Sequence, residues 1–246
     1  MRPPFLLDDV TVLIATFSKI DCLRDTLFTM LTYSDFPLKT IVVNNNVVPE
    51  YRGQVDALVA QTQCKSVDVR HLGDNFRDTG AFNRAMICVE TKYVAMLSDD
   101  LVFVPGCGRK FWEDMLRVLW HPQVGAVGPS NDATWYYQHA CAFDLPDVIE
   151  VPALHGNFVI FKTALYKEMG GYDELLTRGP DLDISYRLTA RGYKLICVRT
   201  SFVHHIGAAT YRELIPDYHE LRDLKFKEKW PNVDSEPPFE LKAWNP

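Results

Sequence analysis

The 246-residue sequence lacks any hydrophobic run long enough to cross a membrane, and it has no Cys-x-x-Cys pair. A membrane-spanning helix needs about 20 consecutive apolar residues, and the apolar run at residues 5–7 is also too short for the core of a signal peptide. The six cysteines are scattered along the chain, which is typical of reduced thiols rather than of a disulfide framework. We therefore expect a cytoplasmic protein without a membrane span.

A basic stripe is also missing from the sequence. The chain has 26 Lys and Arg against 32 Asp and Glu, which gives a formal net charge of −6. Proteins that bind long nucleic acids need positive charge to neutralise phosphates, so a nucleic-acid partner is not expected. A single nucleotide held by a metal ion and a few donors is not excluded. Hydrophobic residues at 47% and charged residues at 24% exclude a disordered or fibrous chain.

The first half of the chain alternates apolar runs with amphipathic segments. Continuous β-branched runs are typical of strands that are buried on both faces, and apolar residues at helical spacing follow them. This alternation predicts an α/β protein with a mostly parallel sheet and helices on both faces. The expected strands of this half are residues 10–15, 40–43, 67–72, 93–97 and 124–127. The second half is less regular, with expected elements at 158–161, 163–169, 181–191, 195–198 and 201–205.

Polar clusters follow three of the predicted strands, at residues 16–18, 44–46 and 98–100. Ligands of open α/β sheets bind beyond the carboxyl ends of the strands. The adjacent carboxylates of Asp99 and Asp100 would raise each other's pKa, and a divalent cation would relieve that cost. Hard oxygen ligands of this kind suit Mg²⁺ or Mn²⁺. The alternative is that Asp99 caps a turn while Asp100 faces water.

Two further clusters are candidates for chemistry. Asp181 and Asp183 follow Gly179-Pro180 at the start of a predicted helix, where the helix dipole alone favours carboxylates. His204 and His205 end an extended segment and could supply one metal ligand. No cysteine and histidine spacing fits a structural zinc motif, so structural zinc is not expected.

The order and spacing of these clusters resemble the inverting glycosyltransferases of family 2, which have the GT-A fold. Each matching stretch is weak alone, but together they span about residues 10–210. The matching stretches are 10–17 (VTVLIATF), 40–45 (TIVVNN), 74–85 (DNFRDTGAFNRA), 93–100 (YVAMLSDD), 156–174 (GNFVIFKTALYKEMGGYDE), 179–198 (GPDLDISYRLTARGYKLICV) and 202–210 (FVHHIGAAT).

The resemblance implies a single GT-A domain over residues 1–246. It would have a Rossmann-like half for the nucleotide sugar at about 10–128, an acceptor and catalytic half at about 129–215, and a tail at 216–246. It also implies Mn²⁺ or Mg²⁺ as cofactor, a nucleotide-sugar donor, and a glycan, glycolipid or protein as acceptor. By the same resemblance Asp181 is the catalytic base, Asp100 and His205 (or His204) hold the metal ion, and the donor is bound by Thr16, Asn44, Arg77, Asn83 and Asp99.

Two positions depart from the family pattern. Asn44 stands where the family usually has an aspartate, and its amide can both donate and accept a hydrogen bond. Uracil and thymine present that complement, which favours a UDP- or dTDP-sugar over a GDP-sugar. Pro180 replaces the acidic residue that often precedes the base, so Asp183 is the fallback for Asp181.

Motifs of other mechanisms are missing. The resemblance implies a single in-line displacement with inversion, which needs no covalent nucleophile, and the chain has no Gly-x-Ser-x-Gly motif. It also lacks the Gln-x-x-Arg-Trp motif of processive synthases, so we expect one sugar to be added per encounter.

Two other functions compete with a glycosyltransferase. A nucleotidyltransferase usually has a glycine-rich, basic loop after its first strand, but residues 15–21 read ATFSKID. A catalytically silent nucleotide-sugar or glycan-binding module would be favoured if the acidic pairs were buried in salt bridges to Arg178, Arg187 or Arg191.

Overall fold

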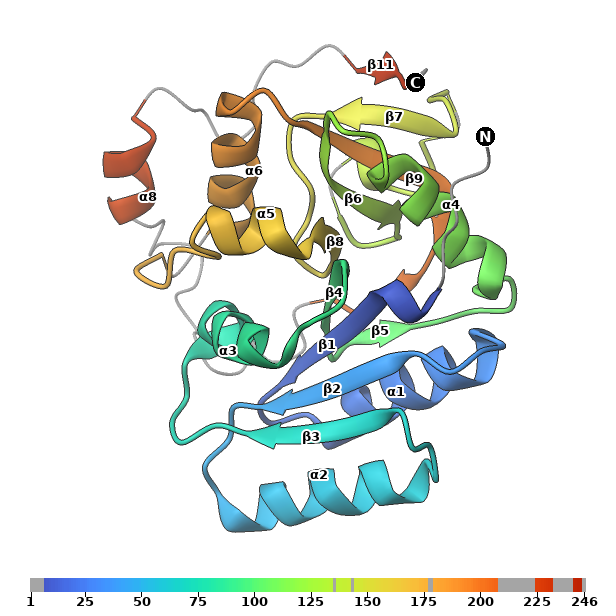
Figure 1. Ribbon diagram of the computed structural model, residues 1–246, viewed down its shortest axis with the longest axis vertical. Helices are drawn as coiled ribbons and strands as arrows, with labels where there is room; N and C mark the ends of the chain where they lie inside the picture. The colour runs from blue at the N-terminus through green and yellow to red at the C-terminus, as the bar shows by residue number, and fades with distance from the viewer. Residues whose placement is uncertain are drawn as a thin grey trace.

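The computed structural model describes residues 7–134, 136–142, 144–176, 179–207, 224–231 and 241–244. Its centre is a nine-stranded sheet with the order β11-β7-β9-β6-β8-β4-β1-β2-β3, beside a two-stranded ribbon of β5 and β10 (Figure 1). The strands of the large sheet are β1 (Val10–Thr16), β2 (Lys39–Asn44), β3 (Val67–His71), β4 (Tyr93–Ser98), β6 (Val124–Ser130), β7 (Val148–Val151), β8 (Phe158–Lys162), β9 (Lys194–Phe202) and β11 (Lys242–Ala243). The ribbon consists of β5 (Leu101–Val102) and β10 (His204–His205).

The sheet is parallel through β4, β1, β2 and β3, as the alternation of the sequence predicts. Strand β8 then runs antiparallel between β4 and β6, whereas β6 and β9 are parallel to each other. Strands β7 and β11 complete the sheet in antiparallel pairing. The predicted α/β fold is therefore confirmed, with a mixed sheet in the second half of the chain.

Helices cover both faces of the sheet (Figure 1). Alternate strand residues face the two layers, so that Ile14 packs in one core and Leu13 in the other. On the face of Ile14 lie α1 (Ile20–Tyr33), α2 (Pro49–Gln61) and α4 (Arg109–Leu119). On the face of Leu13 lie α3 (Arg77–Ala85), α5 (Thr163–Glu168) and α6 (Pro180–Ala190). The other helices among the described residues are the 3₁₀ turns η1 (Leu7–Asp9), η2 (Met86–Cys88) and η3 (Tyr136–Gln138), and α8 (Leu224–Lys229).

Two strands of the large sheet were not predicted from the sequence, and neither was β5 of the ribbon. Strand β7 lies in the aperiodic stretch of the second half, where only alternate residues are buried, and β11 pairs with it. The segments expected at 195–198 and 201–205 form the single strand β9 followed by β10. Within the described residues, no helix combines the length and the apolar character needed to cross a bilayer.

Candidate functional site

The polar clusters of the first half meet at one edge of the sheet. Strand β1 lies between β2 and β4, with Thr16 opposite Asn44 and Ala15 opposite Ser98. The carboxyl ends of these parallel strands therefore deliver their polar residues to the same place, as expected. The hydroxyl of Thr16 lies 2.7 Å from that of Tyr51, a residue of α2 that the sequence did not single out.

Asp99 is buried at this edge, with an exposed fraction of 9%. Burial raises the pKa of Asp99 to about 8, and the charge of Asp100 adds to the shift. A hydrogen bond from Thr16 acts in the opposite direction. Two adjacent carboxylates in a buried position make this edge a place where positive charge is stabilising.

His205 is the histidine that faces the acidic pair. Strand β10 pairs with β5 so that His205 lies opposite Leu101, and its Nε2 lies 3.3 Å from Oδ1 of Asp100. The hydroxyl of Ser98 donates to the same oxygen at 2.6 Å. Although burial favours the neutral ring, the hydrogen bond and the charge of Asp100 raise the pKa of His205.

Asp132 fixes the orientation of both histidines. One of its carboxylate oxygens pairs with the ring of His204, and the other accepts a hydrogen bond from the backbone N–H of His205 at 2.9 Å. The ring of His205 is held from its other side, where Nδ1 lies 3.2 Å from the carbonyl oxygen of Ala133. Of the two candidates, the structure thus places His205 beside Asp100 and turns His204 toward Asp132.

Asp100 and His205 fit a cation that takes its other ligands from a substrate. No group of three or more metal-ligating side chains occurs within the described part of the chain. Mg²⁺ and Mn²⁺ commonly bind through one or two protein ligands together with substrate phosphates and water. A carboxylate and an imidazole at the carboxyl edge of the sheet suit that mode of binding, so the donor set is compatible with the expected metal.

Asp181 lies at the start of α6 and contacts the segment that leads into β8. Its Oδ2 accepts a hydrogen bond from the N–H of Gly156 at 3.2 Å, and its Oδ1 accepts one from the N–H of Leu182 at 3.0 Å. The approach is close because position 156 has no side chain: a Cβ there would lie 3.2 Å from that of Asp181. Gly179 enters the helix with a left-handed φ of 67°, which glycine adopts readily.

His155 connects Asp181 to the metal-ligand candidates. Its ring lies 5.7 Å from the ring of His205, between centroids, and Gly156 follows it in the chain. Burial lowers the pKa of His155, while the charge of Asp181 opposes the shift. The residues at 155 and 156 therefore contact Asp181 on one side and His205 on the other, and they bring the two acidic clusters into one site.

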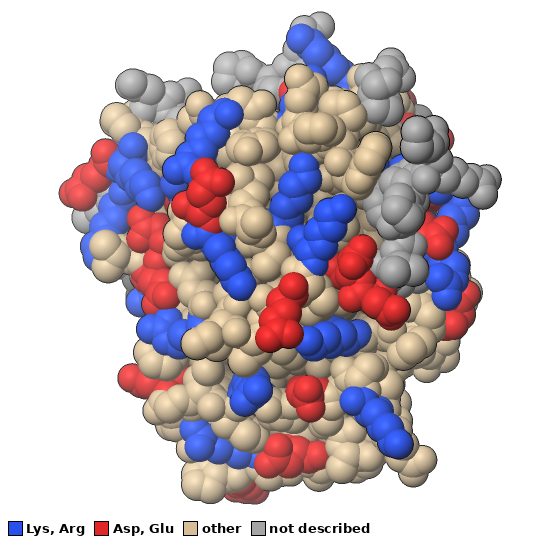
Figure 2. Space-filling view, viewed as in Figure 1, with Lys and Arg blue, Asp and Glu red and all other residues tan. Residues whose placement is uncertain are grey.

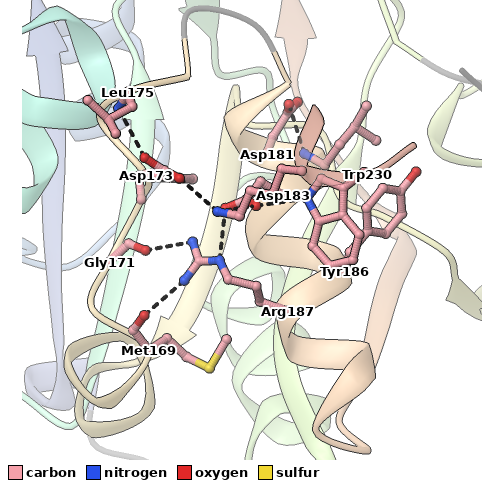
Figure 3. A network of polar contacts seen from close by, with 12 residues as sticks. Met169, Gly171, Asp173, Leu175, Asp181, Asp183, Tyr186, Arg187 and Trp230 are labelled. Atoms are coloured by element: carbon pink, nitrogen blue, oxygen red, sulfur yellow. Dashed lines mark hydrogen bonds and ion pairs between the residues drawn. The ribbon is translucent and has the colours of Figure 1, made fainter. Parts of the chain in front are cut away.

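Asp183 is a structural residue. Its carboxylate is fully buried and is held at 2.8 Å by Arg187, at 2.8 Å by Lys229 and at 2.9 Å by the indole of Trp230 (Figure 3). Figure 3 also shows the carboxylate of Asp181 directed away from this network, as two positions two residues apart on a helix require. Among the described residues, the salt bridge to Arg187 that would favour a silent module thus applies to Asp183 and not to Asp181, whereas Arg178 lies outside the described residues.

Asp183→Asn should lower stability because it leaves the partly buried guanidinium of Arg187 without its counter-ion and removes one of the two carboxylates that pair with Lys229. Breaking a buried ion pair costs about 3–5 kcal/mol, so we expect a loss of about 3 kcal/mol and a fall in Tm of about 6–12 °C. Thermal unfolding followed by circular dichroism measures it. Asp173→Asn is the matched control, because Asp173 pairs with Lys229 in a more exposed position, and it should cost less than about 1 kcal/mol. Equal Tm values for the two variants would contradict this role.

Asn44 and Asn83 use their amides inside the protein. In Asn44, Oδ1 accepts from the N–H of Asn46 at 2.8 Å, and Nδ2 lies 2.9 Å from Nδ1 of His71. Asn83 ties α3 to the segment after α5: its Oδ1 accepts from the hydroxyl of Tyr166 at 2.7 Å. The remaining bonds of Asn83 run from Nδ2 to Tyr172 O and Glu174 Oε1, and from Tyr172 N to Oδ1. Four bonds use all of the capacity of one amide, so a direct contact of Asn83 with a donor would require bonds to be exchanged.

Arg77 is the exposed member of the expected donor set. It begins α3 with a positive φ of 56°, and its carbonyl oxygen accepts a hydrogen bond from the amide of Asn45 at 2.6 Å. This bond joins α3 to the end of β2, beside Thr16 and Asn44. The structure therefore places Arg77 next to the strand edge with an exposed side chain.

Comparisons with known proteins bear on the family and the fold of the chain. A profile of glycosyl transferase family 2 matches residues 11–169, whereas a comparison with curated proteins found no match. Among solved structures, mannosyltransferase PcManGT from Pyrobaculum calidifontis, in complex with GDP-Man and Mn²⁺, has a TM-score of 0.70 at 18% identity. GalNAc-T7, solved with UDP, GalNAc and Mn²⁺, has a TM-score of 0.65 at 12% identity.

The two structural similarities concern the fold. They cover 94% and 80% of this chain, but the chain spans only 66% of PcManGT and 43% of GalNAc-T7. Both solved structures are glycosyltransferases, so their similarity confirms the expected GT-A fold. The family itself is shown by the profile, which matches well over half of the sequence. The chain belongs to glycosyl transferase family 2.

Proposed function

We propose that the protein is a metal-dependent inverting glycosyltransferase, which transfers one sugar from a nucleotide-diphospho-sugar to an acceptor hydroxyl. The observation that carries this proposal is the junction at His155-Gly156. It joins Asp181 to His205 and, through His205, to Asp100. A single displacement needs a base beside the acceptor and positive charge beside the leaving diphosphate, and the site supplies candidates for both.

The donor nucleotide would bind at the carboxyl edge of β1, β2 and β4. Thr16, Asp99 and the exposed Arg77 are the proposed contacts, because they lie at this edge. For Asn44 and Asn83 we propose a supporting role, since their amides already hold neighbouring segments in place. Because the amide of Asn44 is bonded within the protein, the proposed preference for a UDP- or dTDP-sugar is tested separately below.

Asp100 and His205 would hold Mn²⁺ or Mg²⁺ against the diphosphate of the donor. Both solved structures contain Mn²⁺, and the structure of PcManGT also contains the nucleotide sugar GDP-Man. When bound, a divalent cation neutralises charge that develops on the leaving group. The protein's own part is to fix the ligands: Ser98 holds the carboxylate of Asp100, and Asp132 and Ala133 hold His205.

Asp181 would take the proton from the attacking hydroxyl of the acceptor. The N–H groups of Gly156 and Leu182 bind one oxygen each, and this fixes the plane of the carboxylate. A carboxylate oxygen has a second lone pair, so each oxygen can still accept a bond from an acceptor hydroxyl. A positioned general base typically contributes about 10²–10⁴-fold to the rate.

The acceptor is proposed to bind on the side of the second half of the chain, at about 129–215, with the donor in the half at about 10–128. A glycan, a glycolipid or a protein side chain would each offer the hydroxyl. On the face seen in Figure 2, Lys and Arg are interspersed with Asp and Glu. This mixed surface and the net charge of −6 favour such acceptors over a long nucleic acid.

A thermal-shift screen of nucleotide sugars tests the proposed donor. We expect UDP- or dTDP-sugars to raise Tm in the presence of Mn²⁺, because a ligand that binds only the folded state stabilises it by mass action. At a concentration of 100 times Kd the gain is about 2.7 kcal/mol. The same sugars in excess EDTA are the control and should give a smaller shift. A larger shift with GDP-sugars would overturn the base preference, and no shift with any nucleotide sugar would contradict the proposed donor class.

A further inference from the structure

Asn157 is a buried residue of the site whose amide is left without a well-formed hydrogen bond among the described residues. It directly precedes β8 and has an exposed fraction of 4%. Neither its Nδ2 nor its Oδ1 meets the geometry of a hydrogen bond with any residue that the structure describes, although the carboxamide lies beside the ring of His155 and acts to raise the pKa of that ring. Leaving a buried donor or acceptor unpaired costs about 1–3 kcal/mol for each group. The amide therefore lowers the stability of the fold, and the packing around it does not explain why a polar side chain occupies this position.

The backbone of Asn157 lies between the two parts of the site. Its carbonyl oxygen accepts a hydrogen bond from the N–H of Ser98 at 2.9 Å, immediately before Asp99 and Asp100. The residue before it, Gly156, donates to Asp181 at 3.2 Å. Asn157 thus directly follows Gly156, which contacts the proposed base Asp181. Its backbone also pairs with the end of β4, two residues before the proposed metal ligand Asp100.

We propose that the carboxamide of Asn157 binds the sugar that is transferred, an inference that rests on the proposed function. The sugar must lie between the diphosphate near Asp100 and the acceptor hydroxyl near Asp181. During transfer, the bond from its anomeric carbon to the diphosphate oxygen breaks while a bond to the acceptor oxygen forms. Nδ2 needs an acceptor and Oδ1 needs a donor. An ionised diphosphate can only accept, whereas sugar hydroxyls donate and accept, so the sugar is the part of the donor that satisfies both atoms.

Asn157→Leu tests this contact, because leucine keeps a similar size and removes both polar atoms. Isothermal titration with Mn²⁺ present should show the nucleotide sugar bound about ten- to thirty-fold more weakly, as expected for two lost hydrogen bonds. Binding of the matching nucleoside diphosphate, which lacks the sugar, should be unchanged. Tm should stay the same or rise, since the unpaired amide is gone. Asn157→Ser, which keeps one hydroxyl that can donate and accept a bond, provides a second variant with a smaller expected loss.

Thr163→Val is the matched control for a buried polar group. The hydroxyl of Thr163 is also buried without a partner among the described residues, but it lies just after the far end of β8, at the start of α5. This variant should leave the binding of both ligands unchanged. Such a result would separate the role of Asn157 from the general effect of removing an unpaired group from this strand.

Three outcomes would overturn the inference. One is unchanged binding of the nucleotide sugar by both Asn157 variants, and another is an equal loss for the nucleoside diphosphate. The third is a rise in the KM of the acceptor alone, with donor binding intact. If the wild-type protein itself bound no nucleotide sugar, the proposed function would fail first, and the inference about Asn157 would fall with it.

Discussion

Asp181→Asn is expected to lower sugar transfer by at least about 100-fold while leaving the binding of the nucleotide sugar nearly unchanged. The asparagine keeps the shape of the side chain and loses the basic oxygen that would accept the proton of the acceptor hydroxyl. Initial rates of transfer and isothermal titration of the donor measure the two effects separately. The same fall in donor affinity as in rate would indicate that Asp181 acts in binding.

Asp183→Asn gives the comparison for this result, measured well below its lowered Tm. Asp183 is enclosed by Arg187, Lys229 and Trp230, so its replacement should reduce stability and leave most of the turnover (Figure 3). Turnover abolished by Asp183→Asn but retained by Asp181→Asn would reverse the assignment of the base. If neither variant affected turnover, the single-displacement mechanism would be wrong.

Asp100→Ala should abolish the metal dependence of donor binding and lower turnover by about 10³-fold or more. A divalent cation contributes several kcal/mol of charge stabilisation, and each 1.36 kcal/mol corresponds to a factor of ten in rate. The donor affinity of this variant with Mn²⁺ should match that of the wild-type protein in excess EDTA, as measured by isothermal titration. Full turnover of the wild-type protein in EDTA would contradict a metal-dependent reaction.

The two histidines offer a matched pair for the same experiment. His205→Asn should weaken the response to Mn²⁺, because its Nε2 lies 3.3 Å from Asp100. His204→Asn should have a smaller effect, because its ring pairs with Asp132. A larger loss with His204→Asn would assign the metal to the other histidine.

The first half of the fold follows closely from its sequence. The apolar runs of β1, β2 and β4 are buried on both faces, so burial and local preference predict the same structure. Strand β7 is different, because it is buried at alternate positions only and forms by pairing with β9, almost 50 residues later. Such long-range pairing leaves little trace in local sequence.

The site could be predicted at the level of clusters but not of individual contacts. The positions of Thr16, Asn44 and Asp99 at strand ends are enough to bring them to one edge. The amide of Asn44 forms a hydrogen bond with His71, which lies 27 residues away in the sequence, so this contact could not be predicted from local sequence. The role of Asp132 could not be predicted, because it is an isolated carboxylate in an aperiodic segment. It contacts the two histidines only when the fold places β10 beside it.

The two aspartates of α6 show the same limit. Their spacing alone predicts that they point in different directions. Which of them is buried depends on Lys229 at the end of α8 and on Trp230 just after it, more than 40 residues further along the chain. Only the tertiary structure therefore separates the candidate base from the structural carboxylate.

The most direct test of the central claim is proton NMR of the sugar released when the protein hydrolyses its best nucleotide sugar in the absence of an acceptor. Water then takes the place of the acceptor hydroxyl beside Asp181. A single displacement predicts that the first anomer to appear has the configuration opposite to that of the donor, and that its formation is lost in Asp181→Asn and in excess EDTA. Release of the anomer with retained configuration, or hydrolysis that persists in both controls, would contradict the account.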